Sequence, residues 1–385
     1  MVVVLENLTE STLTELLAAL IQIDSTNPSL IAGGVGEAPI AQFVEDWLTR
    51  RGIEVELDQA AAGRPSVVAR VRGQGGGYTL LLNAHLDTVG TANMPDALTP
   101  RIQDGRMYGR GSYDMKSGLA ACMLALLDAQ SANLRGDVIL TAVADEEYAS
   151  IGTSSVLRRV SADAAIVTEP TSLKLCVAHK GFTWHQIKTF GVAAHGSRPD
   201  LGSDAVAQMG RVLSKLEALQ TELECRPAHP LLGHASVHAS TIAGGQELSS
   251  YPAECTLNLE RRTLPGEAAE AVSAEWEGIL AELSNSPDFK AEHQLLLSRS
   301  AFSVPGDAPI VQILEVQAAQ VLGHLPEQIG LSFWMDSALI AGAGIPTVIF
   351  GPHGGGAHSA DEWVDLESVE QCRAILSRVV RAFCG

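Results

Sequence analysis

The order of its apolar segments is the feature that most constrains the fold of this chain. Short runs rich in Val, Ile and Leu alternate with helical segments in the first 180 residues, and this alternation favours an α/β fold with a largely parallel sheet. Apolar residues at helical spacing predict helices over residues 9–23, 38–52 and 117–129. The last of these is apolar on most faces, so we expect it to be buried. The apolar runs between the helices are YTLLLNAH, DVILTAVA and AAIVT.

The pattern changes near Lys180, where a β-α-β-β-α-β order begins that is typical of ferredoxin-like domains. After Pro305 the α/β character returns. We therefore predict one α/β domain of residues 1–180 and 293–385, interrupted by a smaller α+β domain of residues 181–292. The segments expected in the inserted domain are strand 182–190, helix 203–222, strand 235–243, strand 253–261, helix 267–283 and strand 290–297. Two further helices are expected at 309–322 and 366–383.

Composition excludes several classes of protein. The formal net charge of -19 would repel a phosphate backbone, so a nucleic-acid partner is not expected. No apolar run approaches the roughly 18 residues that span a bilayer, and the N-terminus lacks the basic start and long apolar stretch of a signal peptide. Six scattered cysteines with no C-x-x-C pair argue against a zinc ribbon and suit a reducing cytoplasm.

Polar residues gather where the predicted strands end, which is where open α/β sheets bind ligands. His85 and Asp87 follow YTLLLNA, whereas Glu146 and Glu147 follow DVILTAVA. Each pattern also has an ordinary structural explanation, such as a strand-end histidine, a turn aspartate that caps a helix or a solvated acidic turn. The remaining positions of this kind are Asp114 in a Gly-rich turn, Glu169 after AAIVT, and His358 in the loop GPHGGGAHSADE.

These residues together indicate a metal site. A mixture of imidazole and carboxylate ligands suits zinc, with cobalt or manganese as alternatives, better than magnesium alone. Two metals ~3.5–4 Å apart that share a carboxylate and a water would use this number of ligands. The five candidate ligands are His85, Asp114, Glu147, Glu169 and His358.

The segments HLD, GRGSYDMKSG, DEE, TEPTSL and GGGAHSADE, in this order, resemble the family of acetylornithine deacetylase, succinyl-diaminopimelate desuccinylase, aminoacylase and carboxypeptidase G. The resemblance covers nearly the whole chain. It implies a zinc-exopeptidase-like catalytic domain with a mixed sheet, and a ferredoxin-like inserted domain that acts as a lid and in dimerisation. A cytoplasmic homodimer is therefore expected, although some relatives are monomers.

The resemblance also implies roles for the ligands. His85 and Glu169 would bind one metal, Glu147 and His358 the other, and Asp114 both, with a cis peptide after Asp114.

Roles beside the metals follow from the same resemblance. Asp87 would orient His85, and Glu146 would be the general base. His195, in the segment AAHGSRPD, would reach the reacting carbonyl, and Arg262 would bind a substrate carboxylate. For His195 and Arg262 the alternatives are a surface histidine and a solvated arginine.

Three positions at which this sequence departs from the family pattern bear on the identity of the substrate. Ser249 stands where the family often has Asn, Met335 precedes Asp336 where the family has Thr, and Glu260 replaces an Asp. We expect an amidohydrolase that removes an acyl group from a small N-acylated amino acid. A dipeptidase or carboxypeptidase is the alternative within the family, and a non-catalytic, metal-dependent amino-acid-binding protein is the alternative outside it. A serine hydrolase is not supported, because no G-x-S-x-G elbow is present.

Overall fold

The computed structural model describes residues 12–91 and 94–385, and it divides into two compact units. The first unit comprises the chain up to Val177 together with Val304–Ile329 and Met335–Gly385, and the second comprises Ala178–Ser303 and Gly330–Trp334. The predicted boundary at 293 falls inside strand β12 (Ala291–Arg299). Because β12 pairs along its length with β9 (Gly181–Phe190), the second unit extends to Ser303 instead.

The main sheet of the first unit is mixed. Its central strands β6, β3, β7 and β15 are parallel, whereas β1 and β2 on one side and β8 on the other are antiparallel to their neighbours. The largely parallel character that the sequence predicts is therefore confined to the centre. In sheet order the strands are β1 (Glu54–Ala61), β2 (Arg64–Val71), β6 (Val138–Val143), β3 (Leu80–His85), β7 (Ala164–Val167), β15 (Thr347–Ile349), β8 (Leu175–His179) and β13 (Phe302–Ser303). Strand β14 (Gln328–Leu331) also pairs with β8.

Helices on both faces explain why the central strands are buried throughout. Every residue of β3, β6 and β7 is buried. Buried residues of several helices join one face of the sheet in a single hydrophobic cluster, to which α4 (Ile151–Val156) and α8 (Ser337–Gly342) contribute none. Instead α4 contacts β1, β2 and β6, and α8 contacts β15. The helices of the large cluster are α1 (Leu13–Gln22), α2 (Ala38–Thr49), α3 (Lys116–Gln130), α7 (Pro309–Leu322) and α9 (Leu366–Cys384).

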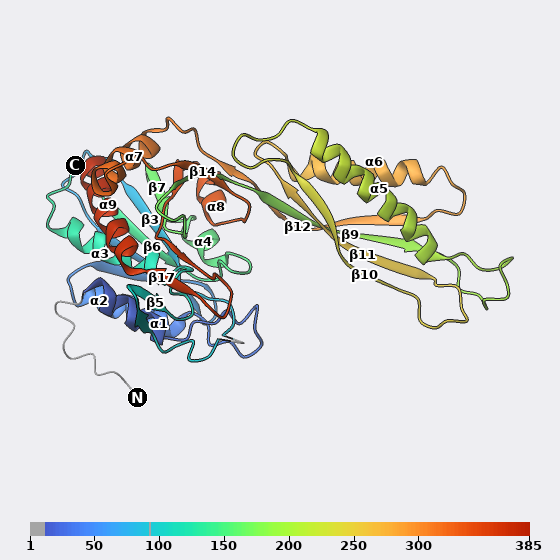
Figure 1. The fold of residues 1–385 in the computed structure, drawn as a ribbon, viewed down its shortest axis with the longest axis horizontal. Coiled ribbons are helices and arrows are strands. Elements are labelled where there is room, and N and C mark those ends of the chain that lie inside the picture. Colours follow the sequence, from blue (N-terminus) through green and yellow to red (C-terminus); the bar gives the residue numbers. More distant parts are fainter. Residues whose placement is uncertain (1–11, 92–93) are drawn as a thin grey trace. The chain divides into compact units, whose positions relative to one another are not determined.

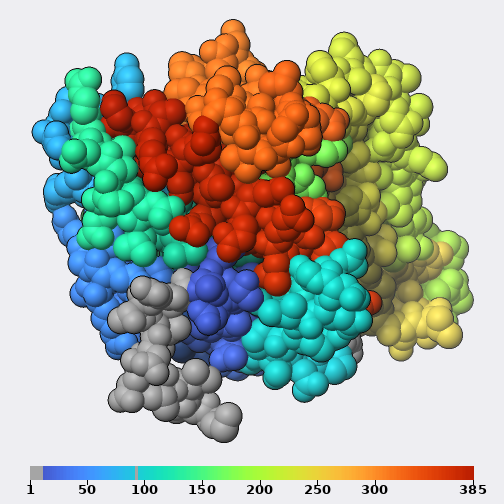
Figure 2. Space-filling model, turned by 60° about the vertical axis from the view of Figure 1, so that its left-hand side comes forward, coloured from blue at the N-terminus to red at the C-terminus, as the bar shows by residue number. Residues whose placement is uncertain are grey.

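The predicted helices of this unit are present with small changes at their ends. Helix α3 is buried at nearly all positions, as its apolar sequence predicts, and it contacts α9 (Figure 1). Figure 2 shows α9 at the surface, in dark red, beside the orange residues of α7. Thr12 caps α1 in a reciprocal capping box with Glu15, so the helix begins after Thr12. The predicted start at residue 9 and the N-terminal segment considered as a signal peptide lie outside the described residues.

The second unit has the β-α-β-β-α-β order that the sequence predicts. Its antiparallel sheet has the order β10-β11-β9-β12. Alternate residues of β9 and β11 are buried, since only one face of this sheet packs against helices. The elements not yet given are α5 (Ala205–Cys225), β10 (Ser236–Gly244), β11 (Glu254–Thr263) and α6 (Ala269–Leu283).

A small antiparallel sheet in the first unit is not predicted by the sequence. It consists of β4 (Arg101–Gln103), β5 (Arg106–Tyr108), β17 (Trp363–Asp365) and β16 (Gly354–Gly355). The pairing of β5 with β17 brings the Gly-rich turn after Tyr108 beside the loop between β16 and β17.

Within the described ranges, no helix combines the length and apolar character that a membrane span needs.

Candidate metal centre

Asp114 lies at the centre of a cluster near the carboxyl ends of the parallel strands. Its Oδ1 is 3.0 Å from Nε2 of His85, which ends β3, and its Oδ2 is 3.3 Å from Nε2 of His358. Glu169 Oε1 lies 3.7 Å from the same His85 nitrogen, and Glu147 Oε1 lies 3.1 Å from Nε2 of His358. The five predicted ligands thus form two groups that share Asp114, and the potential ligand atoms of each group lie within 4.8 Å of one another.

The acids of this cluster are crowded. Burial raises the pKa of Glu169 and Glu147, and the neighbouring charge of Asp114 raises both further. Burial opposes ionisation of Asp114 as well, but hydrogen bonds with His358 and His85 hold the pKa of its carboxyl well below the usual range. The cluster thus brings three carboxyl groups close to two imidazoles, and this excess of acidic groups favours added cations.

The two histidines respond to this negative charge. Burial disfavours the charged form of His85, yet the nearby carboxylates of Glu169 and Asp114 raise its pKa well above the ordinary value. Hydrogen bonds with Asp114 and Glu147 raise the pKa of His358 to about 10. Without bound metal, protonation of His85 and His358 thus supplies part of the positive charge that offsets the nearby carboxylates.

Asp87 contacts His85 through its backbone oxygen rather than through its side chain. Nδ1 of His85 lies 2.9 Å from the backbone oxygen of Asp87 and 3.7 Å from its carboxylate. The Asp87 carboxylate accepts hydrogen bonds from the backbone N–H groups of Glu146 and Glu147, at 3.1 and 3.2 Å, and from the amide of Asn27 at 2.7 Å. Asp87 thus orients His85 through its backbone and holds the acidic loop through its side chain.

A buried polar network around this loop is missed by the sequence analysis. Arg64 forms a bidentate ion pair with Glu37, at 2.5 and 2.6 Å, and donates to Asp145 at 2.8 Å. Asn27 also donates to Asp145, at 3.0 Å. Asn27, Arg64 and Glu37 come from separate segments of the chain, and none lies in a motif. The signal that marks them is the unusual burial of Glu37, which the sequence does not reveal.

The peptide bond between Asp114 and Met115 is cis, as the family resemblance implies. The carboxylate of Glu146 forms no hydrogen bond with any residue of the described ranges, and its side chain is half-buried. Burial and the neighbouring Glu169 raise the pKa of Glu146.

His195 and Arg262 belong to the second unit, so they are not among the residues that the first unit brings together. His195 is exposed, and its Nδ1 lies 2.8 Å from the Ser197 hydroxyl. Arg262 pairs with Glu260 at 2.6 Å and lies over the ring of Phe182, with 5.2 Å from Cζ to the ring centroid. The structure thus gives Arg262 a carboxylate partner within its own strand.

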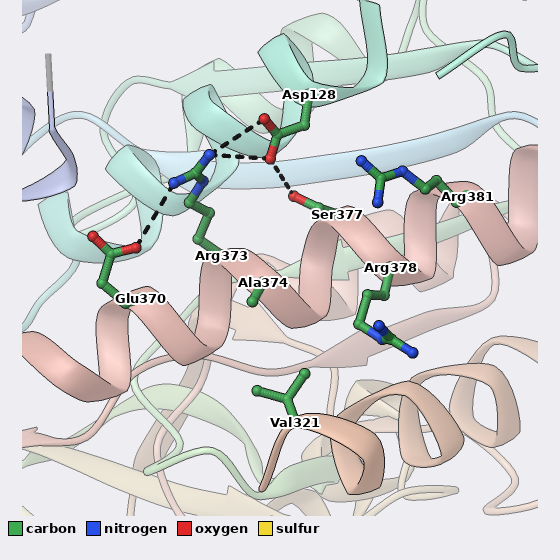
Figure 3. Close-up of a pocket in the computed structure, with 8 residues that line it drawn as sticks. All are labelled: Asp128, Val321, Glu370, Arg373, Ala374, Ser377, Arg378 and Arg381. Atoms are coloured by element: carbon green, nitrogen blue, oxygen red, sulfur yellow. Dashed lines mark hydrogen bonds and ion pairs between the residues drawn. The ribbon is translucent and has the colours of Figure 1, made fainter. Parts of the chain in front are cut away.

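A surface pocket of about 330 Å³ between α3, α7 and α9 contains none of the predicted site residues. Figure 3 shows Arg373 directed toward Asp128, which also accepts from Ser377, while Arg378 donates to Gln317 of α7. Because its arginines do not point to a common centre, we assign the chemistry to the His/Asp/Glu cluster instead.

Solved structures with the same fold are hydrolases. An aminopeptidase PepT from Bacillus cereus superposes with a TM-score of 0.81 and 20% identity, over 97% of this chain and 98% of that one. The YXEP protein of Bacillus subtilis, described as a dinuclear metal-binding peptidase, superposes with a TM-score of 0.73 and 16% identity, over 97% of each chain. The chain thus has the α/β fold of the M20 peptidases.

The chain belongs to peptidase family M20/M25/M40, whose family model matches residues 81–382. Among curated relatives, an acetylornithine deacetylase from Myxococcus xanthus is 31% identical over 97% of both chains. This full-length similarity confirms the family that the five motifs predict.

Proposed function

We propose that this protein is a metal-dependent amidohydrolase that removes the acyl group from a small N-acylated amino acid, as acetylornithine deacetylases do. The observation that carries the proposal is the position of Asp114, whose two carboxylate oxygens face His85 and His358 respectively. A carboxylate shared in this way is the arrangement that a two-metal hydrolytic site requires.

The residues present fit two divalent cations. His85 and Glu169 would hold one ion, Glu147 and His358 the other, and Asp114 both, which is consistent with the crowding of acids in the cluster. Nitrogen and oxygen ligands in this mixture favour zinc, with cobalt or manganese as alternatives. When bound, the ions would act as Lewis acids toward the amide carbonyl and the attacking water.

Glu146 is the proposed general base. Its carboxylate would take a proton from the attacking water and return it to the amine nitrogen as the C–N bond breaks. Its lack of a hydrogen-bond partner among the described residues leaves both oxygens available for this proton. A protein that only bound amino acids would not need such a group, so catalysis is the better explanation.

His195 and Arg262 are proposed substrate residues of the second unit, which we propose to be a lid. His195 would donate a hydrogen bond to the developing oxyanion. Arg262 would bind a substrate carboxylate, for which it must release Glu260. Closure of a lid would exclude water from the reacting amide.

A dipeptidase or carboxypeptidase is the second candidate, because the similar solved structures include aminopeptidase PepT and a metallo-carboxypeptidase of the same family from Sulfolobus solfataricus. The same groups would hydrolyse a peptide bond. The similarity to acetylornithine deacetylases over the full length of the chain favours the deacylase.

We also propose a cytoplasmic homodimer formed through the second unit. Strand β10 is the outer strand of its sheet and is exposed along most of its length, with Ile242 at 53% exposure. An edge of this kind is suited to pairing with a second copy. None of the six cysteines, all of which lie in the described residues, forms a disulfide, which agrees with a reducing compartment.

A substrate panel tests the function. The protein is freed of metal, loaded with zinc, cobalt or manganese, and assayed with N-acetyl amino acids, N-succinyl amino acids and dipeptides. The proposal predicts metal-dependent release of the acyl group with the highest kcat/KM on an N-acyl amino acid. Higher kcat/KM on dipeptides would favour the second candidate, and no hydrolysis of any amide with any metal would contradict both.

A further inference from the structure

Glu362 binds the backbone of the turn that carries Asp114. Its buried carboxylate accepts hydrogen bonds from the N–H groups of Gly111, Tyr113 and Asp114, at 3.1, 3.0 and 3.0 Å. These three hydrogen bonds hold the backbone of the turn, whereas the Asp114 side chain contacts His85 and His358, which are themselves proposed ligands.

Arg110 completes this arrangement from the other side. It is 2% exposed, and its Nη1 donates to Glu362 Oε2 at 2.5 Å. Its Nη2 donates to the backbone oxygen of Ser359, the residue after His358, at 3.0 Å, and its Nε donates to the backbone oxygen of Gly90 at 3.2 Å. One buried ion pair thus links the turn of Asp114 to the loop of His358.

The two segments also share the small sheet. Met107 of β5 is paired with Val364 of β17, and both are buried. The sheet sets the approximate separation of the segments, and the Arg110–Glu362 pair fixes their ends. In the group of Asp114, Glu147 and His358, the positions of Asp114 and His358 therefore depend on this pair. In the group of His85, Asp114 and Glu169, only the position of Asp114 does.

We propose that Arg110 and Glu362 are positioning residues that set the metal affinity of the site formed by Asp114, Glu147 and His358. This inference rests on the proposed two-metal function. Groups behind the ligands of a metal commonly control affinity in this way, and their loss typically costs about 10- to 100-fold.

The chemistry of the pair suggests the sharpest substitution. Glu362→Gln replaces one acceptor oxygen by an NH2 group, which would face N–H donors and could not accept from them. The turn must then shift to satisfy its own N–H groups. Arg110→Lys keeps the charge but loses the planar fork that reaches both Glu362 and Ser359.

Zinc titration of the metal-free protein against a competing chromogenic chelator measures each binding step. For wild type we expect two ions per chain. For Glu362→Gln and Arg110→Lys we expect one step weakened by about 10- to 100-fold and the other changed much less. Asp128→Asn is the matched control, because Asp128 also pairs with an arginine, Arg373, in a pocket that none of the proposed ligands lines (Figure 3).

The outcomes separate this inference from the proposed function. Fewer than two ions in wild type would overturn both. Two ions in wild type with unchanged affinities in both variants would overturn the inference alone. Equal weakening of both steps, matched by Asp128→Asn, would mean general destabilisation and would also overturn it. If Glu362→Gln does not fold, Arg110→Lys decides between these results.

Discussion

The amide of Asn27 donates a 2.7 Å hydrogen bond to the carboxylate of Asp87, which in turn accepts from the backbone of Glu146 and Glu147. The same amide reaches Asp145 at 3.0 Å. A single side chain from the loop after α1 thus supports the loop that carries both the proposed general base and a proposed ligand.

We predict that Asn27→Ala lowers kcat by about 10- to 100-fold, because Asp87 loses its side-chain donor and the acidic loop is freed to move. Steady-state kinetics at saturating metal measures the effect. Asn83→Ala is the control, since Asn83 is also buried and loses one side-chain hydrogen bond, to Thr141, outside this loop. Similar kinetics in the two variants would contradict the role of Asn27.

Glu146→Gln should lower kcat by a factor of about 100 to 10,000, because glutamine has a similar shape but cannot take the proton. Metal content, measured by elemental analysis, should stay at the wild-type value. Near-native turnover in this variant would show that Glu146 is not the base, whatever the metal content.

Gly118 lies in α3, beside the end of the strand that precedes Glu169. A Cβ at this position would lie 2.3 Å from the backbone oxygen of Thr168. Gly118→Ala should therefore lower the free energy of unfolding by about 1–3 kcal/mol through overpacking.

Gly278, within α6, is the matched control for this substitution. A Cβ there would meet no atom within 4 Å. Gly278→Ala should raise the free energy of unfolding by about 0.5–1 kcal/mol, since alanine favours the helix. Urea denaturation of both variants checks the pair, and a change of the same sign at the two positions would contradict the packing argument.

The stability of the protein should fall in acid through His185. Its ring is buried between His293 and Thr183, each at 2.8 Å, and burial lowers its pKa from 6.5 to about 4, with help from the neighbouring His293. Between pH 6.5 and 4 the unfolded chain binds a proton at this position that the folded chain does not. The free energy of unfolding should thus decrease with falling pH by up to ~1.4 kcal/mol per pH unit from this group.

His185→Gln should remove this part of the slope, and His238→Gln, at an exposed position of the same unit, should not. Chemical denaturation at several pH values between 4 and 7 compares the three proteins. An identical slope in wild type and His185→Gln would exclude His185 as the source.

Tertiary contacts changed the expected role of several residues. The sequence suggests that the Asp87 side chain orients His85, but the backbone of Asp87 does so while its carboxylate accepts from Asn27. Arg262 looks like a free cation in the sequence, yet its neighbour Glu260 binds it. A pattern of residue types indicates which groups can interact, but the folded structure decides which of the available partners each group meets.

The antiparallel edges of the main sheet show the same limit. Strands β1 and β2 are antiparallel to their neighbours, and the composition of a strand does not reveal its direction. The small sheet of β4, β5, β16 and β17 consists of strands of two or three residues, which are too short to produce a periodic pattern.

The sequence by itself determined the order of the main helices and central strands, the inserted β-α-β-β-α-β unit, and Asp114 with the four residues that surround it. It could do so because apolar periodicity sets local structure, and because parallel strands bring their carboxyl ends to one edge of the sheet. Only the tertiary structure decided how that site is supported, through Asn27, Arg64, Arg110 and Glu362. Their contacts join segments separated by up to 252 positions, and burial at that range leaves no local pattern in the chain.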